Sequence, residues 1–429
     1  MTPIIEASEQ WQEESPDEVI DGLERDSYKR EVLRPGDSNP SECFSLKKRE
    51  DAWLLSSSYF IGADWLEEGR AAIRILPKFD TDDGKVQVDY LSMLEEALKE
   101  PKNFDHLDGL LFVDFKRPCI DIPQQDDELS LFLVSEFLSV MSAITKKGLK
   151  KAYYQVEGNL QSKIKGKMLV VQNIKKNNAR GNFSNNYCRY QEYGIDIPEN
   201  HLLKAALMEA ARIVESYEKG VDVSHLTDIV RAIKPKWEKV STKAHPKFLR
   251  ASKSNAFYKE YPIAIRLAQL VLKHASINQV LHGTKTAKTP PYWIDMSKLF
   301  EMYVLRLLRE RFDNKVEYHV RFRGGLEPDY LLHSDEVRPP YIVDAKYKRY
   351  NKNPLEVNDI RQVSGYARLK TVRKRLCVLS QSIIPCLIIY PDLEGNDVLP
   401  DYKGWTADTY YEEIYKVGIR LPLIKVNDK

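Results

Sequence analysis

The stretch EPDYLLHSDEVRPPYIVDAKYKRY, Glu327–Tyr350, combines the pattern of a buried strand with charged residues. Its second half, YIVDAKYK, is apolar enough for a core strand, yet it contains Asp344 and Lys346. Because side chains alternate along a strand, these two residues share a face, with Cα atoms about 7 Å apart. Asp329 precedes them in a Pro-Asp pair. If the segment forms an antiparallel hairpin, Asp329 can lie close to Asp344.

Two carboxylates in a partly buried place repel each other unless a cation lies between them. Oxygen ligands suit Mg²⁺ or Mn²⁺, and the eight histidines show no HxxxH or HExxH spacing that would indicate zinc. A divalent cation stabilises charge on a phosphate oxygen, and a neighbouring lysine can orient the attacking water. Asp329, Asp344 and Lys346 therefore indicate phosphodiester hydrolysis. The alternative is a surface strand with an ordinary Asp–Lys ion pair.

Two predicted helices flank this hairpin and carry polar residues that suit the same chemistry. DMSKLFEMYVLRLLRERF is expected to begin with Asp295 as its N-cap, and it places Glu301 at the margin of an apolar stripe. EVNDIRQVSGYARLKTVRKRL predicts a second helix, on which Gln362 and Tyr366 are four residues apart and share a face. All three side chains could contact a bound phosphate or metal, or could lie on solvated helix surfaces.

The order of elements in residues 290–429 predicts the fold class of this part. Its first helix is followed by three strand candidates, of which the first is KVEYHVRF and the other two form the hairpin. The second helix and the strand candidates PCLIIY and IRLPLIKVN come next. This order is typical of an α/β layer whose sheet is covered by helices.

The whole chain is predicted to be an α/β (α+β multi-domain) protein, because 429 residues exceed one ordinary core. Its composition, 43% hydrophobic and 30% charged, is typical of a soluble globular protein. We expect four parts along the chain. They are a loosely attached, polar acidic lead segment at 1–40, a β-rich domain with a possible partner-docking role at 41–145, a basic, mainly helical region at 146–289, and the α/β domain at 290–429.

Charge is distributed unevenly along the chain. Residues 1–50 contain 13 Asp and Glu against 7 Lys and Arg, whereas residues 146–250 contain 21 Lys and Arg against 10 Asp and Glu. The basic part indicates either a polyanionic partner or a solvated basic surface. No apolar run approaches the ~20 residues that cross a bilayer, and the N-terminus lacks a signal pattern. We therefore expect a cytoplasmic protein that binds no membrane.

Four motifs occur in register over about 65 residues, at Glu301, 328–329, 344–346 and 362–366. Together they resemble the PD-(D/E)XK nucleases, in the branch that carries an added QxxxY motif. Upstream, EGNLQSKIKGKMLVVQNIKKN and CRYQEYGIDIPENHLLKAAL extend the resemblance to the McrC family, the nuclease subunits of McrBC-type modification-dependent restriction systems. It covers roughly residues 150–390, and the first 145 residues match only in their β-rich character.

The resemblance implies a PD-(D/E)XK restriction-endonuclease-like domain at 290–429 and a role for each motif residue. Asp329, Asp344 and the Ala345 carbonyl would bind Mg²⁺ or Mn²⁺, and Lys346 would be the catalytic lysine. The implied catalytic set as a whole is Glu301, Asp329, Asp344, Lys346, Gln362 and Tyr366.

The resemblance also implies a partner, an AAA+ GTPase ring of the McrB type that recognises modified double-stranded DNA and would dock on the N-terminal and middle regions. The sequence has no GxxxxGK[ST] P-loop, since Gln161 occupies the first glycine position before Gly166 and Met168 follows Lys167. We therefore expect that the chain binds no nucleotide alone. The acidic lead segment departs from the family pattern and leaves the docking of this partner open.

These observations favour a Mg²⁺-dependent DNA endonuclease subunit that works with, and stimulates, a GTPase. One alternative is a non-catalytic adaptor that activates the NTPase and retains a nuclease fold as a scaffold. Another is a standalone repair-type nuclease, which would cut unmodified DNA without a partner. The sequence does not specify which modified base or sequence context is recognised.

Overall fold

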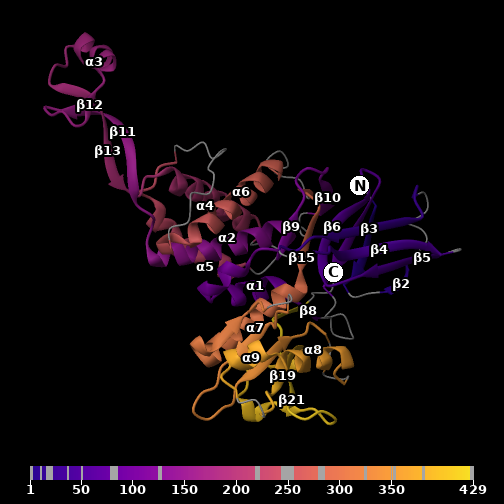
Figure 1. The fold of residues 1–429 in the computed structure, drawn as a ribbon. Coiled ribbons are helices and arrows are strands. Elements are labelled where there is room, and N and C mark those ends of the chain that lie inside the picture. Colours follow the sequence, from indigo (N-terminus) through magenta and orange to yellow (C-terminus); the bar gives the residue numbers. More distant parts are fainter. Residues whose placement is uncertain are drawn as a thin grey trace. The chain divides into compact units, whose positions relative to one another are not determined.

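The chain forms two compact units, which are described separately (Figure 1). Unit 1 combines Met1–Leu129 with Gly283–Lys429, and unit 2 is Ser130–His282. The computed structural model describes residues 3–9, 12–15, 23–35, 38–49, 52–77, 86–123, 128–217, 223–242, 256–278, 286–322, 326–348, 350, 354–378 and 382–425.

The N-terminal part of unit 1 contains two sheets, with strand orders β1-β7-β6-β15-β9 and β2-β5-β4-β3. Their strands are β1 (Ile4–Ser8), β2 (Gln12–Ser15), β3 (Ser27–Val32), β4 (Ser41–Arg49), β5 (Ala52–Ser57), β6 (Phe60–Glu67), β7 (Ala71–Leu76), β9 (Leu111–Val113) and β15 (Tyr292–Asp295). Smaller elements of the same unit are α1 (Tyr90–Leu98), the pair β10 (Ile120–Pro123) and β14 (Thr286–Thr289), and the pair β8 (Val86–Val88) and β22 (Leu423–Lys425).

Residues 1–40 were expected to be a loosely attached lead segment, and for the described residues of this segment the expectation is wrong. β1 pairs in parallel with β7, β2 pairs with β5, and β3 pairs with β4. The buried side chains of Ile5, Tyr28 and Val32 belong to the same hydrophobic cluster as Phe44 and Trp293. Apolar residues in this segment are sparse, and the acidic residues around them concealed the strand pattern.

β15 joins this part of the unit to the long helix α7 (Met296–Phe312). It pairs with β6 and β9 and ends at Asp295. The Asp295 carboxylate accepts a hydrogen bond from the Lys298 amide at 3.1 Å, which confirms it as the N-cap of α7. Two guanidinium nitrogens of Arg34 each lie 2.6 Å from Asp295 Oδ2, and the aspartate is fully buried. One side chain therefore both caps the helix and anchors it to the N-terminal sheets.

We expect Asp295→Ala to lower the free energy of unfolding by about 2.5–4 kcal/mol, because it removes a helix cap and the charged hydrogen bonds from Arg34. Asp89 provides a matched control, since it caps α1 through the Ser92 amide at 2.9 Å. Its replacement by alanine should cost about 1 kcal/mol, the usual value of a cap. Urea denaturation of both variants checks the difference, and equal losses would contradict the anchoring role of Asp295.

The C-terminal part of unit 1 is a six-stranded mixed sheet with the order β16-β17-β18-β19-β21-β20. β16, β17 and β18 are antiparallel, whereas β18, β19 and β21 are parallel neighbours. In Figure 1, α7, α8 and α9 surround this sheet. The elements are β16 (Val316–Tyr318), β17 (Tyr330–Leu332), β18 (Tyr341–Ala345), α8 (Val357–Ala367), α9 (Lys370–Arg375), β19 (Cys386–Asn396), β20 (Thr406–Ala407) and β21 (Ile414–Ile419).

Two details of this part differ from the sequence-based expectations. The single helix expected after the hairpin is two helices, because the chain is extended at Leu369, between α8 and α9. The expected final strand, IRLPLIKVN, contributes only its first residue to β21, and Leu423–Lys425 forms β22, which pairs with β8 outside the main sheet. Pro422 lacks an amide proton, so an uninterrupted strand through it would lose a hydrogen bond.

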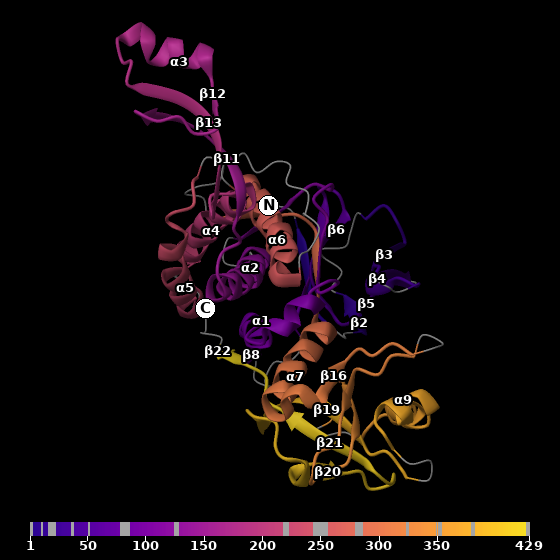
Figure 2. The ribbon, with the colours of Figure 1, turned by 60° about the vertical axis from the view of Figure 1, so that its left-hand side comes forward.

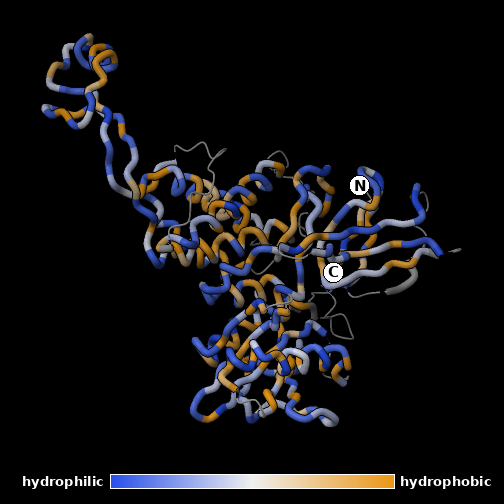
Figure 3. Tube along the Cα trace, viewed as in Figure 1, coloured by the Kyte–Doolittle hydropathy of each residue, from blue (hydrophilic) through white to orange (hydrophobic). Residues whose placement is uncertain are grey.

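Unit 2 packs helices together and carries a long antiparallel hairpin. Figure 2 shows β11 and β13 as a narrow arm with α3 at its far end, and Figure 3 shows hydrophobic and hydrophilic residues alternating along the helices. Sequence reasoning predicted helices here but not the arm. The elements are α2 (Glu128–Lys147), β11 (Ala152–Gln161), β12 (Lys167–Met168), α3 (Val170–Lys176), β13 (Asn185–Gly194), α4 (Pro198–Tyr217), α5 (Ser224–Ile233) and α6 (Glu260–Asn278).

Within the described part of the chain, the window Leu129–Lys147 of α2 is long and apolar enough to cross a membrane by length and composition, with a mean hydropathy of 1.4. The sequence-based statement that no apolar run approaches this length is therefore wrong. However, 78% of the window is buried inside the protein, as is usual for the core helix of a folded domain.

Candidate active site

The hairpin of β17 and β18 brings the two aspartates together. Tyr330 pairs with Val343 in the antiparallel register, so Asp329 stands opposite Asp344 at the open end of the hairpin. The amide of Ala345 donates a hydrogen bond to Asp329 Oδ2 at 2.9 Å. The sequence predicted that an antiparallel hairpin would bring these two aspartates close together. The hydrogen bond fixes one carboxylate oxygen of Asp329 next to the strand that carries Asp344.

Asp344 is fully buried, and its Oδ1 atom has no hydrogen-bond partner among the described residues. Its one close partner is Lys346, whose Nζ lies 2.8 Å from Oδ2. Burial raises the pKa of Asp344, and the nearby Glu301 carboxylate raises it further, while Lys346 opposes both. A buried carboxylate with an unsatisfied oxygen is costly, and such groups occur where the protein binds an ion or performs chemistry.

The pKa of Asp329 is also raised well above its usual value. Burial is the main cause, followed by the charges of Asp344 and Glu301. The Lys346 ammonium and the Ala345 amide lower the pKa of Asp329, but they do not offset these effects. The carboxylates of Asp344 and Glu301 thus act on Asp329 together, and the Lys346 ammonium opposes them.

Lys346 follows directly after the end of β18 and links the aspartates to helix α8. Its ammonium donates a hydrogen bond to Gln362 Oε1 at 2.9 Å, and Gln362 Nε2 donates to the Tyr366 hydroxyl at 3.1 Å. Burial alone would lower the pKa of Lys346, but the carboxylates of Asp344 and Asp329 raise it above its ordinary value. Lys346 is therefore held as a cation, and the predicted pair on α8 is its support.

Glu301 comes from α7 and approaches the aspartates from the helix side. The Tyr318 hydroxyl donates to Glu301 Oε2 at 3.3 Å, and the Tyr330 hydroxyl donates to the Glu301 backbone oxygen at 2.6 Å. His319 Nε2 lies 3.2 Å from the same Oε2. Ligand atoms of Glu301, His319 and Asp329 all lie within 4.8 Å of one another, which is compatible with a shared metal ion.

The structure brings all six predicted site residues to one end of the hairpin and adds residues that the sequence did not single out. His319 is one of them. Lys348 is another, and it pairs with Glu356 at 2.7 Å and Asp359 at 3.0 Å. Tyr350 also donates a hydrogen bond to Asp359. These contacts tie the chain after β18 to the first turn of α8 and to Glu356 before it.

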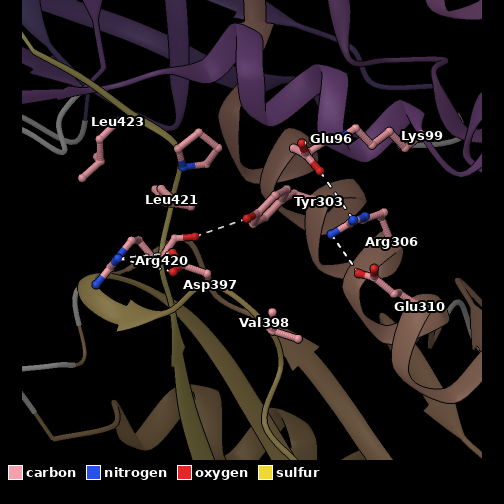
Figure 4. A pocket seen from close by; sticks show the side chains of 11 residues that line it. Glu96, Lys99, Tyr303, Arg306, Glu310, Asp397, Val398, Arg420, Leu421 and Leu423 are labelled. Carbon is pink, nitrogen blue, oxygen red and sulfur yellow. Dashed lines mark hydrogen bonds and ion pairs between the residues drawn. The ribbon is translucent and has the colours of Figure 1, made fainter.

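A cavity of about 560 Å³ lies elsewhere in unit 1, between α1, α7 and the segment that leads to β22 (Figure 4). Its charged residues are already paired. Arg306 contacts Glu310 at 3.0 Å and Glu96 at 3.5 Å, and Arg420 contacts Asp397 at 3.3 Å. Because these charged side chains already form ion pairs with one another, the cavity is a weaker candidate for a ligand-binding site than the acidic site.

The fold and site define a mixed α/β protein with a buried acidic centre that contains one lysine. The sequence matches the family described as "McrBC 5-methylcytosine restriction system component" over residues 60–379. The chain belongs to this family and is a subunit of a McrBC-type restriction system. The match begins well before residue 150, where the resemblance noted from the sequence began. Most of the first β-rich region therefore also belongs to the family match.

Two solved structures resemble this chain with low sequence identity and low TM-scores. No curated protein sequence matches it. One is a half-complex from a tetradecameric assembly of Thermococcus gammatolerans McrB AAA+ hexamers with bound McrC, with 14% identity, a TM-score of 0.42, and coverage of 97% of this chain and 94% of that one. The other is the Thermococcus gammatolerans McrBC complex, with 14% identity, a TM-score of 0.31, and coverage of 71% and 87%.

Proposed function

We propose that this chain is the nuclease subunit of its restriction system, a metal-dependent endodeoxyribonuclease with a PD-(D/E)XK-type domain at 290–429. The observation that carries this proposal is the buried Asp344, which stands opposite Asp329, contacts Lys346 through Oδ2, and has no hydrogen-bond partner among the described residues at Oδ1. An adaptor that needed only the fold could replace Asp344 with an apolar residue and avoid the cost of burying it.

The donor set fits a hard divalent cation such as Mg²⁺ or Mn²⁺. Asp329, Asp344 and the Ala345 carbonyl would hold it, and Glu301 adds a fourth oxygen donor nearby. When bound, such a cation supplies charge stabilisation at a phosphate oxygen and acidifies water. The mutual repulsion of the carboxylates, which raises the pKa of Asp329, is the repulsion that a cation would relieve.

The remaining residues of the site would position the substrate and the attacking water. The Lys346 ammonium is charged at neutral pH, so we assign it to holding a phosphate oxygen or water rather than to removing a proton. Gln362 orients Lys346 through its carbonyl oxygen, and Tyr366 fixes the amide of Gln362. In this arrangement Tyr366 acts through Gln362 and does not contact the substrate.

We propose that the substrate is modified double-stranded DNA and that the partner is an AAA+ GTPase ring of the McrB type. The chain has no P-loop of its own, so a separate subunit must supply the nucleotide-driven motor. The arm of unit 2 is a surface that suits such a partner, because its far end exposes Val171 at 67% and Phe183 at 75% next to several lysines. Deletion of the arm is expected to abolish assembly with the ring, as measured by size-exclusion chromatography.

A reconstituted cleavage assay tests the proposed function. The chain is combined with the AAA+ protein encoded beside it, Mg²⁺, GTP and either 5-methylcytosine-containing or unmodified DNA. We expect cleavage only of the modified DNA and only with both proteins present. Cutting of both DNAs by the chain alone would indicate a standalone nuclease, and GTP hydrolysis without any cutting would indicate an adaptor.

The raised pKa of Asp329 predicts a pH-dependent effect of metal on stability. Below the ordinary pKa range of carboxyl groups, Asp329 is protonated in both the folded and the unfolded protein. As the pH rises through the raised pKa of the folded state, the folded protein gains a charge that the neighbouring carboxylates repel. The metal-free protein therefore loses stability as the pH rises. A cation removes this loss, and at 100 times its Kd it adds about 2.7 kcal/mol. We expect Mn²⁺ to raise Tm more at pH 8 than at pH 5.5, as measured by calorimetry; an equal rise at both pH values would argue against binding at these carboxylates.

A further inference from the structure

Helix α8 exposes one of its faces directly beside the acidic site. Gln362 belongs to this face, and its Oε1 atom accepts the hydrogen bond from Lys346 that connects the helix to the aspartates. Arg361, Gly365 and Arg368 are also exposed. Residues that are three, four or seven positions apart lie on the same side of a helix, so these three residues form one row. The row begins next to the glutamine that supports the lysine of the site.

The segment 357–375, which contains α8 and α9, is strongly basic. It has six Lys and Arg residues and one acidic residue, Asp359, which is buried and already forms an ion pair within the same domain. Arg361 and Arg368 form no ion pair with the described residues. Uncompensated positive charge beside an acidic centre indicates an anionic ligand. Exposed arginines are also common on solvated helices, and Gly365 is what distinguishes this face from them.

Gly365 lies in the last turn of α8, and nothing within the described part of the chain requires glycine there. A Cβ atom at this position would meet no atom within 4 Å, so packing does not exclude a side chain. Its φ angle lies outside the left-handed region, so it is not a glycine cap. Glycine destabilises a helix relative to almost every other residue. Its effect here is to leave the helix backbone bare between two arginines, as glycine does where a ligand must approach closely.

The length of the row matches the spacing of phosphates along a DNA strand. Arg361 and Arg368 are seven residues apart, and seven residues of α-helix span about 10.5 Å. Each DNA strand carries one phosphate per about 3.4 Å of helix axis, so the two guanidinium groups can reach phosphates about three nucleotides apart. The planar guanidinium group also binds a phosphate through two parallel hydrogen bonds. Gly365 leaves room for the strand between these two contacts.

We propose that Arg361, Gly365 and Arg368 form a phosphate track, which positions the backbone of the DNA strand that is cut next to the acidic site. This inference rests on the proposed function, because it assigns positioning residues to the same substrate. The two arginines bind phosphates beside the scissile one, and Gly365 lets the strand approach the helix. Phosphate contacts fix the register of a protein on DNA without reading its sequence. The track therefore acts on any DNA that reaches the site.

The test is binding of the full chain to an unmodified, fluorescent DNA duplex, measured by anisotropy at several salt concentrations from about 50 to 200 mM with Ca²⁺ in place of Mg²⁺. Arg361→Gln and Arg368→Gln each remove one charge from the track. The matched control is Arg375→Gln, which removes the same charge from the same basic segment, but Arg375 is already paired with Glu317 at 2.9 Å. Gly365→Gln adds a long side chain to the row without a charge, and Gly365→Ala adds a single methyl group.

We expect each track arginine variant to make the slope of log affinity against log salt shallower by about 0.9 and to weaken binding at low salt about tenfold. Arg375→Gln should keep the wild-type slope. Gly365→Gln should also weaken binding, yet it should raise Tm by about 1 °C because glutamine is the better helix former. Lost folding therefore cannot explain its weaker binding. Gly365→Ala should raise Tm similarly and retain more of the affinity.

Unchanged slopes in both track arginine variants overturn the inference, as do wild-type affinity in Gly365→Gln and a wild-type chain that binds no duplex at about 50 mM salt. The proposed function is decided separately, by cleavage of modified DNA with the partner present. A wild-type chain that cuts this DNA while the slopes stay unchanged overturns the track alone. A chain that binds DNA with the expected slopes but never cuts it overturns the proposed function and leaves the track as a DNA-binding surface.

Discussion

Replacement of Asp344 with asparagine is expected to reduce DNA cleavage by about 10²- to 10³-fold or more, because cation-based charge stabilisation contributes several kcal/mol to the transition state. Asparagine has nearly the same shape as aspartate, so the hairpin of β17 and β18 should persist. The affinity for Mn²⁺ should fall together with the cleavage rate, because Asp344 is a proposed metal ligand and cleavage requires the metal. Cleavage is measured with the partner GTPase present, and metal binding by isothermal titration calorimetry.

Asp335→Asn is the matched control for this variant. Asp335 lies in the connection of the same hairpin and accepts hydrogen bonds from the Val337 and Arg338 amides at 3.1 and 2.9 Å. An asparagine oxygen can accept the same two bonds, so the connection should keep its shape. We expect wild-type cleavage and metal affinity for this variant. Full cleavage by Asp344→Asn would show that the metal and the chemistry are located elsewhere.

Replacement of Lys346 with methionine should lower the cleavage rate by about 10²- to 10³-fold, the usual effect of removing one preorganised donor at a developing charge. Metal binding should behave differently from the Asp344 variant. The ammonium lies 2.8 Å from Asp344 and competes with a cation for its carboxylate. Without this charge, Mn²⁺ should bind as tightly as in the wild type or more tightly, which calorimetry can measure.

Lys348→Met tests whether any lysine in this segment has the same effect. Lys348 is two residues from Lys346, but its ammonium pairs with Glu356 and Asp359 rather than with Asp344. We expect this variant to lose some stability and to retain cleavage.

If Lys346→Met weakened Mn²⁺ binding as strongly as Asp344→Asn does, Lys346 would have a structural role in the metal site instead of a role in the reaction.

The sequence was sufficient to predict the hairpin and the meeting of its two aspartates. Strand alternation restricts Asp344 and Lys346 to one face, and the short connection after Asp329 restricts the register of its partner strand. The N-cap at Asp295 and the shared face of Gln362 and Tyr366 were equally local predictions. They followed from helix start signals and from the four-residue spacing on a helix.

His319 could not be predicted from the sequence, because a single histidine in KVEYHVRF has no ligand spacing. Its place depends on the pairing of β16 with β17 and on one left-handed backbone angle, which are tertiary features. The strands of residues 1–40 were missed for a related reason. β1 pairs with β7, which is more than 60 residues away, and no pattern within an isolated strand of Ile4–Ser8 reveals that partner.

The central claim is that a divalent cation binds between Asp329 and Asp344. Crystals of the chain grown with Mn²⁺ and measured at the manganese absorption edge test it most directly. We predict an anomalous peak about 2.0–2.5 Å from a carboxylate oxygen of each aspartate, which Asp344→Asn removes. Mn²⁺ bound elsewhere, or no peak at a concentration that supports cleavage, would contradict the claim.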